Sequence, residues 1–278
     1  IVEGQNRLLP VPSVDEEMSK LLLREAKKKG IKVELARTVN ATKVEDGKVF
    51  ADLGPSPFLA PELVPASAKK PATLEADCIF MTIGRTANSE GLGLAESGIA
   101  TDKRGYVTVN DHLETSVPGV YAIGDILGPA RIMLAHMASA EAHVAVANIF
   151  GASEKPNYDV VPSGICSSPE IGDVGLTEAQ AKDKGFEVQT SEFQFRELGK
   201  AQAMSELPGM FKIVSDGATG KVLGVHIAGA HATDLIAEAG LALRLGASVR
   251  DIAATVHAHP TLAEGLYEAA LSLVEAGG

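Results

Sequence analysis

"IVEGQNRLLPVPSVDEEMSKLLLREAKKKGIKVELA", residues 1–36, predicts a strand, a helix and a second strand in succession. The first strand is the apolar "IVEG", which ends near the acid Glu3. Acidic residues 15–17 fill the first turn of the helix, three lysines fill its last turn, and Gly30 stands where a helix typically stops. Alternating apolar and polar residues at 31–36 predict the second strand. This order of elements indicates an α/β fold.

The next segments extend this unit. Asp46-Gly47 between two alternating stretches predicts a hairpin. Residues 54–71 carry five of the fourteen prolines and predict a surface excursion. "LEADCIFMTIG", residues 74–84, is a nearly continuous apolar run, which is typical of a buried strand. Together these elements predict the second part of a nucleotide-binding α/β unit, whose first strand and phosphate-binding turn are not in the sequence.

The middle of the chain is predicted to hold short strands and one helix. Residues 105–126 read as short strands that end in Gly124-Asp125. Residues 133–151 predict a helix with an alanine-rich face suited to close packing.

From about residue 156 the pattern becomes that of an independent α+β module. Thr177 and Gln180 have the spacing of a capping box before a helix that Gly185 closes. Residues 210–229 predict a hairpin. Residues 233–246 predict a helix that is apolar nearly all round, so both of its faces are expected to be covered. Residues 248–278 predict two further helices with a bend between them.

Composition narrows the class of protein. The 278 residues suggest about two domains, and 45% hydrophobic with 22% charged residues is typical of a soluble globular chain. The net charge of −11 argues against nucleic acid as the main partner, and no apolar run approaches the roughly 18 residues that a membrane helix needs. Because the chain opens with Ile1 in a strand-like stretch, we expect it to begin partway into a fold.

The two cysteines carry little functional signal. Cys78 and Cys166 are 166 − 78 = 88 residues apart, which fits neither a disulfide framework nor a zinc site. We expect both to be small core residues in a reducing, cytoplasmic setting.

The stretch "HAHPTLAE", residues 257–264, is the main candidate for catalysis. Pro260 predicts the first position of a helix, so that His259 lies at its entrance and Glu264 about one turn inside. A carboxylate bonded to one ring nitrogen fixes the tautomer of an imidazole and leaves the other nitrogen as a base. Two alternatives stay open: the pair only caps the helix, or His257 and His259 share a metal ion.

Three more residues are candidates for ligand binding, each with a structural alternative. Asp125 ends an apolar strand, where α/β folds bind ligands, but it could also satisfy its own turn. Glu3 ends its strand as the ribose-binding acid of a dinucleotide fold does, or is simply solvated. Gly84 in "TIGR" would allow the backbone to approach a ligand closely.

In their order along the chain these segments resemble the flavin disulfide reductases, and within them the branch that acts on dihydrolipoyl groups. The resemblance covers essentially the whole chain. The pattern Ala-His-Pro-Thr-Leu at 258–262 favours that branch over glutathione reductases, which typically place serines after His-Pro-Thr. The segments that carry it are "IVE", "DEEMS", "TIGRTAN", "TSVPGVYAIGDI", "MLAHMASAEA", "SSPEIGDVGLTEAQA", "IAGAHATDLI" and "HAHPTLAE".

The resemblance implies roles for single residues. His259 would take a proton from a dihydrolipoyl thiol and Glu264 would orient it, after which the thiolate attacks a disulfide and electrons pass through FAD to NAD. Asp125 would hold the ribityl and phosphate region of FAD. The flavin ring would lie against Met133, Leu134, Ala135 and His136. The NAD would be held by Glu3 at its adenosine ribose, with Val39 and Gly84 beside it.

The resemblance also implies a domain organisation and partners. It divides the chain into a partial NAD-binding domain (1–85), a central FAD-contacting domain (86–155) and an interface domain (156–278). In the family the disulfide reached by this histidine belongs to the other subunit, so a homodimer through 156–278 is implied. A dihydrolipoyl domain of a 2-oxoacid dehydrogenase-type complex is the implied further partner.

Two departures from the family pattern limit what the chain is expected to do. The FAD domain with its Gly-x-Gly-x-x-Gly and the redox Cys-x₄-Cys are not in the sequence. We therefore expect a carboxyl-terminal part of the enzyme that is inactive alone; the alternative is a dimerising module without catalysis. The second departure is that the segment between Asp125 and Met133 is a residue or two longer than is usual in the family.

Overall fold

The structure is a computed structural model that describes residues 1–276. The chain folds into two compact units, one formed by residues 1–79 and 162–278 and the other by residues 80–161. Helices and strands are mixed throughout, which confirms the predicted α/β and α+β character. The division into domains at 1–85, 86–155 and 156–278 stays a prediction.

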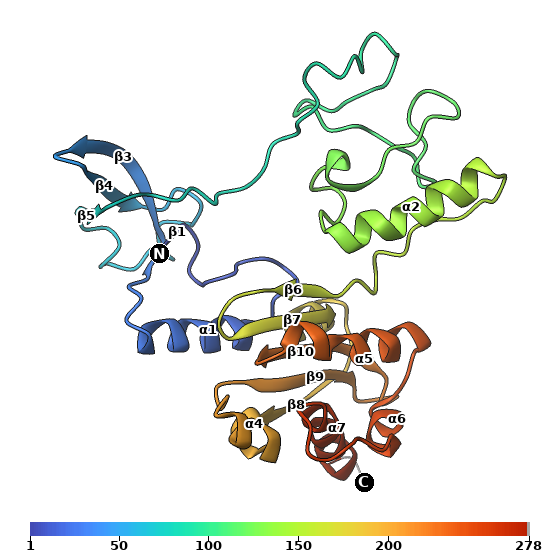
Figure 1. Cartoon of the computed structure of the whole chain (residues 1–278). Helices are drawn as coiled ribbons and strands as arrows, with labels where there is room; N and C mark the ends of the chain where they lie inside the picture. The colour runs from blue at the N-terminus through green and yellow to red at the C-terminus, as the bar shows by residue number, and fades with distance from the viewer. Residues whose placement is uncertain (277–278) are drawn as a thin grey trace. The chain divides into compact units, whose positions relative to one another are not determined.

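A five-stranded antiparallel sheet is the centre of the first unit. Its order is β6-β7-β10-β9-β8, and Figure 1 shows the strands stacked in this order. The predicted hairpin at 210–229 is confirmed as β9 and β10. The strands are β6 (Ser163–Ile165), β7 (Glu170–Gly175), β8 (Val188–Gln194), β9 (Met210–Asp216) and β10 (Val222–Gly229).

Helices α5 (Ala232–Leu245) and α7 (Glu264–Ala276) cover one face of this sheet, and the short α6 (Val249–Ala254) packs against α7. Close approach depends on small residues. A Cβ atom built on Gly172 of β7 would lie 2.4 Å from the carbonyl oxygen of Ala232, and one on Gly265 of α7 would lie 2.1 Å from the ring of Phe211. Side chains larger than hydrogen at these two positions would push the helices off the sheet.

Helix α1 (Glu16–Lys28) lies on the opposite face. Ile171 packs with α1 while its neighbour Gly172 faces α5, as expected because successive side chains of a strand point to opposite faces. Asp15 is the N-cap of α1 and accepts a hydrogen bond from the Glu17 N–H, so its predicted place in the first turn is wrong by one residue. The buried apolar cluster formed by α1, the segment before it and the sheet consists of Leu8, Val14, Met18, Leu21, Leu22, Ile171, Met210 and Ala228.

Three short helical segments lie between the strands β7, β8 and β9. The predicted capping box is confirmed, because Thr177 and Gln180 bond reciprocally at the start of α3 (Glu178–Asp183). Next come η2 (Phe195–Glu197) and α4 (Gly199–Met204).

Residues 1–79 also contain two small sheets. β1 (Val2–Glu3) pairs in parallel with β2 (Glu34–Leu35). β3 (Arg37–Glu45), β4 (Lys48–Pro55) and β5 (Ala72–Ala76) form an antiparallel sheet. The hairpin predicted at Asp46-Gly47 is confirmed; both residues have positive φ, which a two-residue turn of this kind requires.

The buried strand predicted at 74–84 is wrong. Only its first residues pair, as the end of β5, and Phe80, Met81 and Ile83 are exposed without strand structure. A buried strand needs hydrogen-bonded neighbours, and β5 takes the available edge of β4 instead. Cys78 is exposed for the same reason and Cys166 is exposed as well, so the expectation that both are core residues is also wrong.

Both faces of the helix predicted at 233–246 were expected to be covered, and within one copy of the chain only one of them is. The sheet covers the side of α5 that carries Ile236 and Ala239. Leu241 and Leu245 on its other side are exposed. The apolar surface of α5 therefore exceeds what one copy of the sheet can bury.

The second unit is built around η1 (Gly124–Leu127) and α2 (Ala135–Ile149), the helix predicted at 133–151. Its buried core includes Leu113, Leu127 and Ala145. The strands predicted at 105–126 are wrong: within that stretch pairing is limited to isolated bridges, because glycines with positive φ turn the chain repeatedly. In residues 1–276, no helix is both long and apolar enough to cross a membrane.

A row of ionisable side chains crosses the sheet beneath α1. Asp173, His226 and Lys212 occupy matching positions on β7, β10 and β9. Nε2–H of His226 faces the carbonyl oxygen of Leu176 at 3.1 Å, and Nδ1 lies 3.4 Å from Oδ1 of Asp173. The other carboxyl oxygen of Asp173 is buried and has no hydrogen-bond partner. Burial raises the pKa of Asp173 above its ordinary 3.8, although the hydrogen bond from His226 opposes this.

The stability of Asp173→Asn, compared with that of the parent chain at the same pH, is expected to increase as the pH rises. A carboxyl whose pKa is raised in the folded state binds more protons there than in the unfolded state, so stability falls as the pH rises above 3.8 and through the folded-state pKa. The amide cannot ionise and removes this loss. Urea unfolding between about pH 4 and about pH 8 measures the effect, with Asp183→Asn at the exposed end of α3 as control. An equal loss of stability for Asp173→Asn at both ends of the range would contradict the expectation.

Candidate active site

The candidate catalytic residues lie in the loop between α6 and α7. The predicted helix start at Pro260 is wrong, because α7 begins at Glu264. The preceding turn is closed by bonds three residues apart, from Gly265 N–H to Leu262 and from Leu266 N–H to Ala263, so it is not yet α-helical. Glu264 is therefore the first residue of the helix rather than one turn inside it.

The structure nevertheless brings His259 and Glu264 together. Nδ1 of His259 lies 2.8 Å from Oε1 of Glu264, and the second carboxylate oxygen accepts the Thr261 N–H at 2.7 Å. The hydrogen bond from the Thr261 backbone, followed by that from His259, lowers the pKa of Glu264. An ionised carboxylate can only accept, so Nδ1 carries the hydrogen and Nε2 has a free lone pair. This ring can take up a proton at Nε2.

The two side chains of this pair differ in their exposure to solvent. The His259 side chain is 75% exposed and the Glu264 side chain 20%. The carboxylate is thus held against the protein while the imidazole faces outwards, available to a group that another molecule supplies.

The alternative of a metal site on His257 and His259 finds no support in residues 1–276, where no group of three or more His, Cys, Asp or Glu side chains is placed to hold an ion. Nε2 of His257 lies instead 2.9 Å from Oε1 of Glu238 on α5. Sequence reasoning missed Glu238. The available signal was a glutamate in the middle of a helix that is otherwise nearly apolar.

The predicted flavin residues lie in the second unit. Asp125 and Met133 line a cavity of about 330 Å³ together with Arg85 and Tyr106. The guanidinium of Arg85 is paired with the Asp125 carboxylate. Leu134 is the N-cap of α2 and provides no side-chain cap, and Ala135 and His136 begin the helix. Leu134, Ala135 and His136 do not line the cavity, whereas the carboxylate of Asp125 and the guanidinium of Arg85 in it fit a ligand with hydroxyl and phosphate groups.

The predicted NAD residues are not all in one unit. Glu3 ends β1, which contacts β3, the strand that carries the half-exposed Val39. One carboxylate oxygen of Glu3 accepts the Gln5 N–H at 2.8 Å. Gly84, with a φ of +131°, belongs to the other unit. That these three residues share one cofactor stays a prediction.

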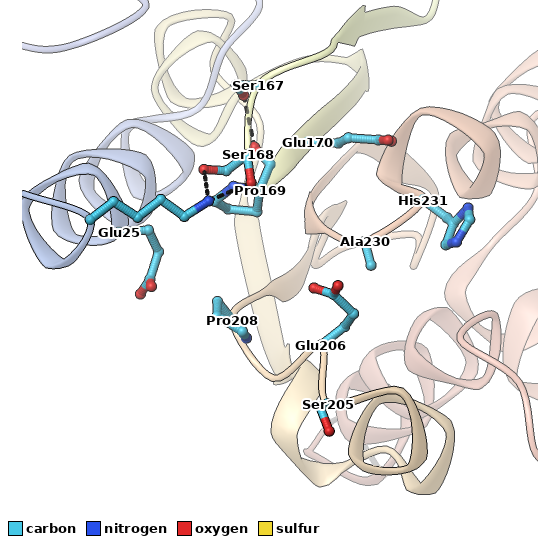
Figure 2. Close-up of a pocket in the computed structure, with 11 residues that line it drawn as sticks. Glu25, Ser167, Ser168, Pro169, Glu170, Ser205, Glu206, Pro208, Ala230 and His231 are labelled. Atoms are coloured by element: carbon cyan, nitrogen blue, oxygen red, sulfur yellow. Dashed lines mark hydrogen bonds between the residues drawn. The ribbon is translucent and has the colours of Figure 1, made fainter. Parts of the chain in front are cut away.

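A larger cavity, of about 420 Å³, lies elsewhere in the first unit (Figure 2). Glu25 of α1 and Lys29, the C-cap of this helix, line one side of it, and the Lys29 ammonium donates to the hydroxyl and carbonyl oxygens of Ser168. Glu206 and His231 line another side. None of the predicted site residues lines this cavity.

Comparison with protein families gives the class of the protein. Residues 1–142 match the model described as pyridine nucleotide-disulphide oxidoreductase, and residues 161–270 match the dimerisation domain of the same proteins. The chain belongs to the pyridine nucleotide-disulphide oxidoreductase family. The resemblance to flavin disulfide reductases is thereby confirmed.

The similar curated proteins are dihydrolipoyl dehydrogenases. That of Chlorobaculum tepidum is 40% identical over 279 residues, covering 100% of this chain and 56% of its own length. That of Bacillus subtilis is 39% identical over 271 residues, covering 97% and 54%, and the human mitochondrial one is 38% identical, covering 93% and 49%. The chain thus spans about half the length of the relatives it matches.

Solved structures agree on the fold. LpdA from Mycobacterium tuberculosis superposes with a TM-score of 0.83 at 24% identity, over 98% of this chain and 55% of that one. The HOCl-induced flavoprotein disulfide reductase RclA from Escherichia coli superposes with a TM-score of 0.84 at 20% identity, over 98% and 58%.

Proposed function

We propose that the chain supplies the carboxyl-terminal part of an FAD-dependent dihydrolipoyl dehydrogenase, with His259 as its acid/base and Glu264 as the group that orients it. The outward-facing imidazole, held through Nδ1 by an ionised carboxylate, is the observation that carries the proposal. The 38–40% identity to dihydrolipoyl dehydrogenases supports the choice of substrate class.

In this proposal His259 takes the proton of a dihydrolipoyl thiol at Nε2, while Glu264 holds Nδ1–H and stabilises the imidazolium that forms. The resulting thiolate is the nucleophile for a redox disulfide. That disulfide comes from residues outside the 278 of this sequence, because Cys78 and Cys166 lack the required spacing. FAD, when bound, would supply the two-electron redox chemistry that links the dithiol to NAD.

The cavity in the second unit supports Asp125, Met133 and Arg85 as cofactor residues, with Asp125 at the ribityl hydroxyls, Met133 at the flavin ring and Arg85 towards phosphate. The resemblance to flavin disulfide reductases adds Leu134, Ala135 and His136, at the start of α2, to the flavin-ring residues. For NAD we assign Glu3, Val39 and Gly84. A carboxylate at Glu3 favours NAD over NADP because it would repel a 2′-phosphate.

A second copy of the chain is the proposed direct partner. Leu241 and Leu245 on α5, and Val256 in the loop before His259, are exposed and offer apolar surface to a partner. A homodimer through residues 156–278 would cover this surface and bring His259 to the other subunit's disulfide. The substrate would arrive on a dihydrolipoyl domain of a 2-oxoacid dehydrogenase-type complex, in a cytoplasmic setting.

A fusion protein tests the proposal. The chain replaces the matching part of the Chlorobaculum tepidum dihydrolipoyl dehydrogenase, and the fusion is expected to bind flavin, dimerise and reduce NAD with dihydrolipoamide. The chain alone is expected to be colourless and inactive but dimeric. A dimeric, flavin-bound fusion without activity would favour a dimerising module without catalysis, and a chain that is monomeric alone would contradict the proposed interface.

A further inference from the structure

We propose that His257 and Glu238 are a positioning pair that anchors the loop of His259 and keeps its imidazole aimed at the substrate. The inference rests on the proposed role of His259 and extends it to two residues that never touch the substrate.

Burial identifies His257 as the anchor of the loop. Residues 255–260, which follow the end of α6, have no regular structure, and all of them except His257 are exposed. The His257 side chain is only 6% exposed, whereas that of His259, two residues later, is 75% exposed. Without His257, the segment that presents His259 would have no side chain packed into the protein.

The hydrogen bonds of His257 use both ring nitrogens. Nδ1 lies 2.9 Å from the Thr255 carbonyl oxygen, which can only accept, so Nδ1 carries a hydrogen. Nε2 lies 2.9 Å from Oε1 of Glu238, so one proton is held between this nitrogen and the carboxyl group. The ring also packs against Tyr267 with centroids 5.7 Å apart. His257 thereby ties the loop to α5 through Glu238 and to α7 through Tyr267.

Hydrogen bonds of Thr261 also fix the loop on the carboxyl-terminal side of His259. The Thr261 hydroxyl donates to the Ala258 carbonyl oxygen at 2.7 Å, and the Thr261 N–H donates to Glu264 at 2.7 Å. His259 is thus held between two fixed points, His257 before it and Thr261 after it.

Glu238→Gln is the informative variant. The amide keeps the shape of the side chain but carries no charge, so it cannot balance an imidazolium. The charge-assisted bond at Nε2 of His257 is replaced by a weaker neutral one, in which the amide N–H donates to Nε2 while Nδ1–H keeps its bond to Thr255. The tie between the loop and α5 is thereby weakened. The matched control is Asp234→Asn, which removes a carboxylate from the same helix where it pairs at 3.5 Å with His231, an exposed histidine.

In the fusion enzyme, Glu238→Gln is expected to lower kcat about tenfold to a hundredfold with little change in KM, because a small misplacement of a catalytic group has this effect. Asp234→Asn should leave kcat unchanged. In a His259→Gln background Glu238→Gln should cause no further loss, since a positioning residue has nothing left to position. The same loss of kcat in both backgrounds would overturn the inference and leave the proposed function intact. A His259→Gln variant that keeps the kcat of the parent would instead overturn the proposed function.

A spectroscopic measurement on the 278-residue chain itself is independent of activity. With ¹⁵N-labelled histidine, the parent chain should show His259 mainly as the Nδ1–H tautomer. Glu238→Gln should shift or broaden the His259 ring signals, and Asp234→Asn should not. Identical His259 spectra in the parent and Glu238→Gln would overturn the inference.

Discussion

Lys212→Ala is expected to lower the free energy of unfolding by about 3–5 kcal/mol at neutral pH, the usual loss when one partner of a buried ion pair is removed. The Lys212 ammonium lies 2.9 Å from Oδ1 of Asp15 and 2.8 Å from Oε2 of Glu178. The side chains of Lys212 and Asp15 are 4% and 3% exposed. Without Lys212, the carboxylate of Asp15 stays buried with only backbone N–H donors, and α1 loses its polar contact with the sheet.

The pH dependence of this loss follows from the carboxyl groups. Burial alone would raise the pKa of Asp15, but the hydrogen bond and charge of Lys212, together with the charge of His226, lower it below 3.8. Hydrogen bonds from Lys182 and Lys212 lower the pKa of Glu178 below 4.5. A lowered folded-state pKa gives stability that is present above the unfolded value and lost as the pH falls through the folded one. The difference between parent and Lys212→Ala should therefore shrink in acid.

Urea unfolding at neutral pH and at about pH 3 measures both effects. Lys43→Ala is the control, because Lys43 pairs with Glu45 on the surface and such pairs contribute about 0–1 kcal/mol. The double variant Asp15→Asn with Lys212→Met removes both charges and should recover part of the loss. A parent-like midpoint for Lys212→Ala would show that the pair does not fasten α1 to the sheet.

His259→Gln in the fusion enzyme is expected to lower kcat by about 10²–10⁴-fold, the usual contribution of a general acid/base. Glutamine has no nitrogen that can accept a proton, so the dihydrolipoyl thiol would have to lose its proton to water. Glu264 should keep its bond to the Thr261 N–H, which leaves the start of α7 intact. Binding of dihydrolipoamide should change little.

His231→Gln is the matched control for this measurement, because His231 is also exposed and beside a carboxylate, Asp234, but lies at the N-cap of α5. Steady-state reduction of NAD by dihydrolipoamide gives kcat and KM for each variant. If His259→Gln retains more than about a tenth of the parent rate, a different group takes the thiol proton.

Local signals predicted much of the fold. The hairpin at Asp46-Gly47 and the capping box of Thr177 and Gln180 were found because each depends on residues within one turn of the chain. The pairing of His259 with Glu264 has the same origin, since only five positions separate them. The resemblance to flavin disulfide reductases added what such signals lack, the order of whole segments.

The wrong predictions concern segments whose burial and pairing depend on residues far away in the sequence. Residues 79–83 have the composition of a buried strand, yet β4 offers its edge to residues 72–76 instead. The helix at 233–246 looked covered on both faces, but one sheet can bury only one side of it. The hydrophobic pattern of a segment indicates how much apolar surface it can bury. It does not show whether the same chain provides an element that packs against this surface.

The sequence by itself determined the α/β and α+β class, the family and the catalytic candidate His259, because these depend on local geometry and on the order of segments. The tertiary structure alone decided that Asp15 pairs with Lys212, 197 residues away, and that Glu238 on α5 holds His257. The physical reason is that strand order, register and helix placement bring these groups together. Short-range spacing carries no information about contacts of that length.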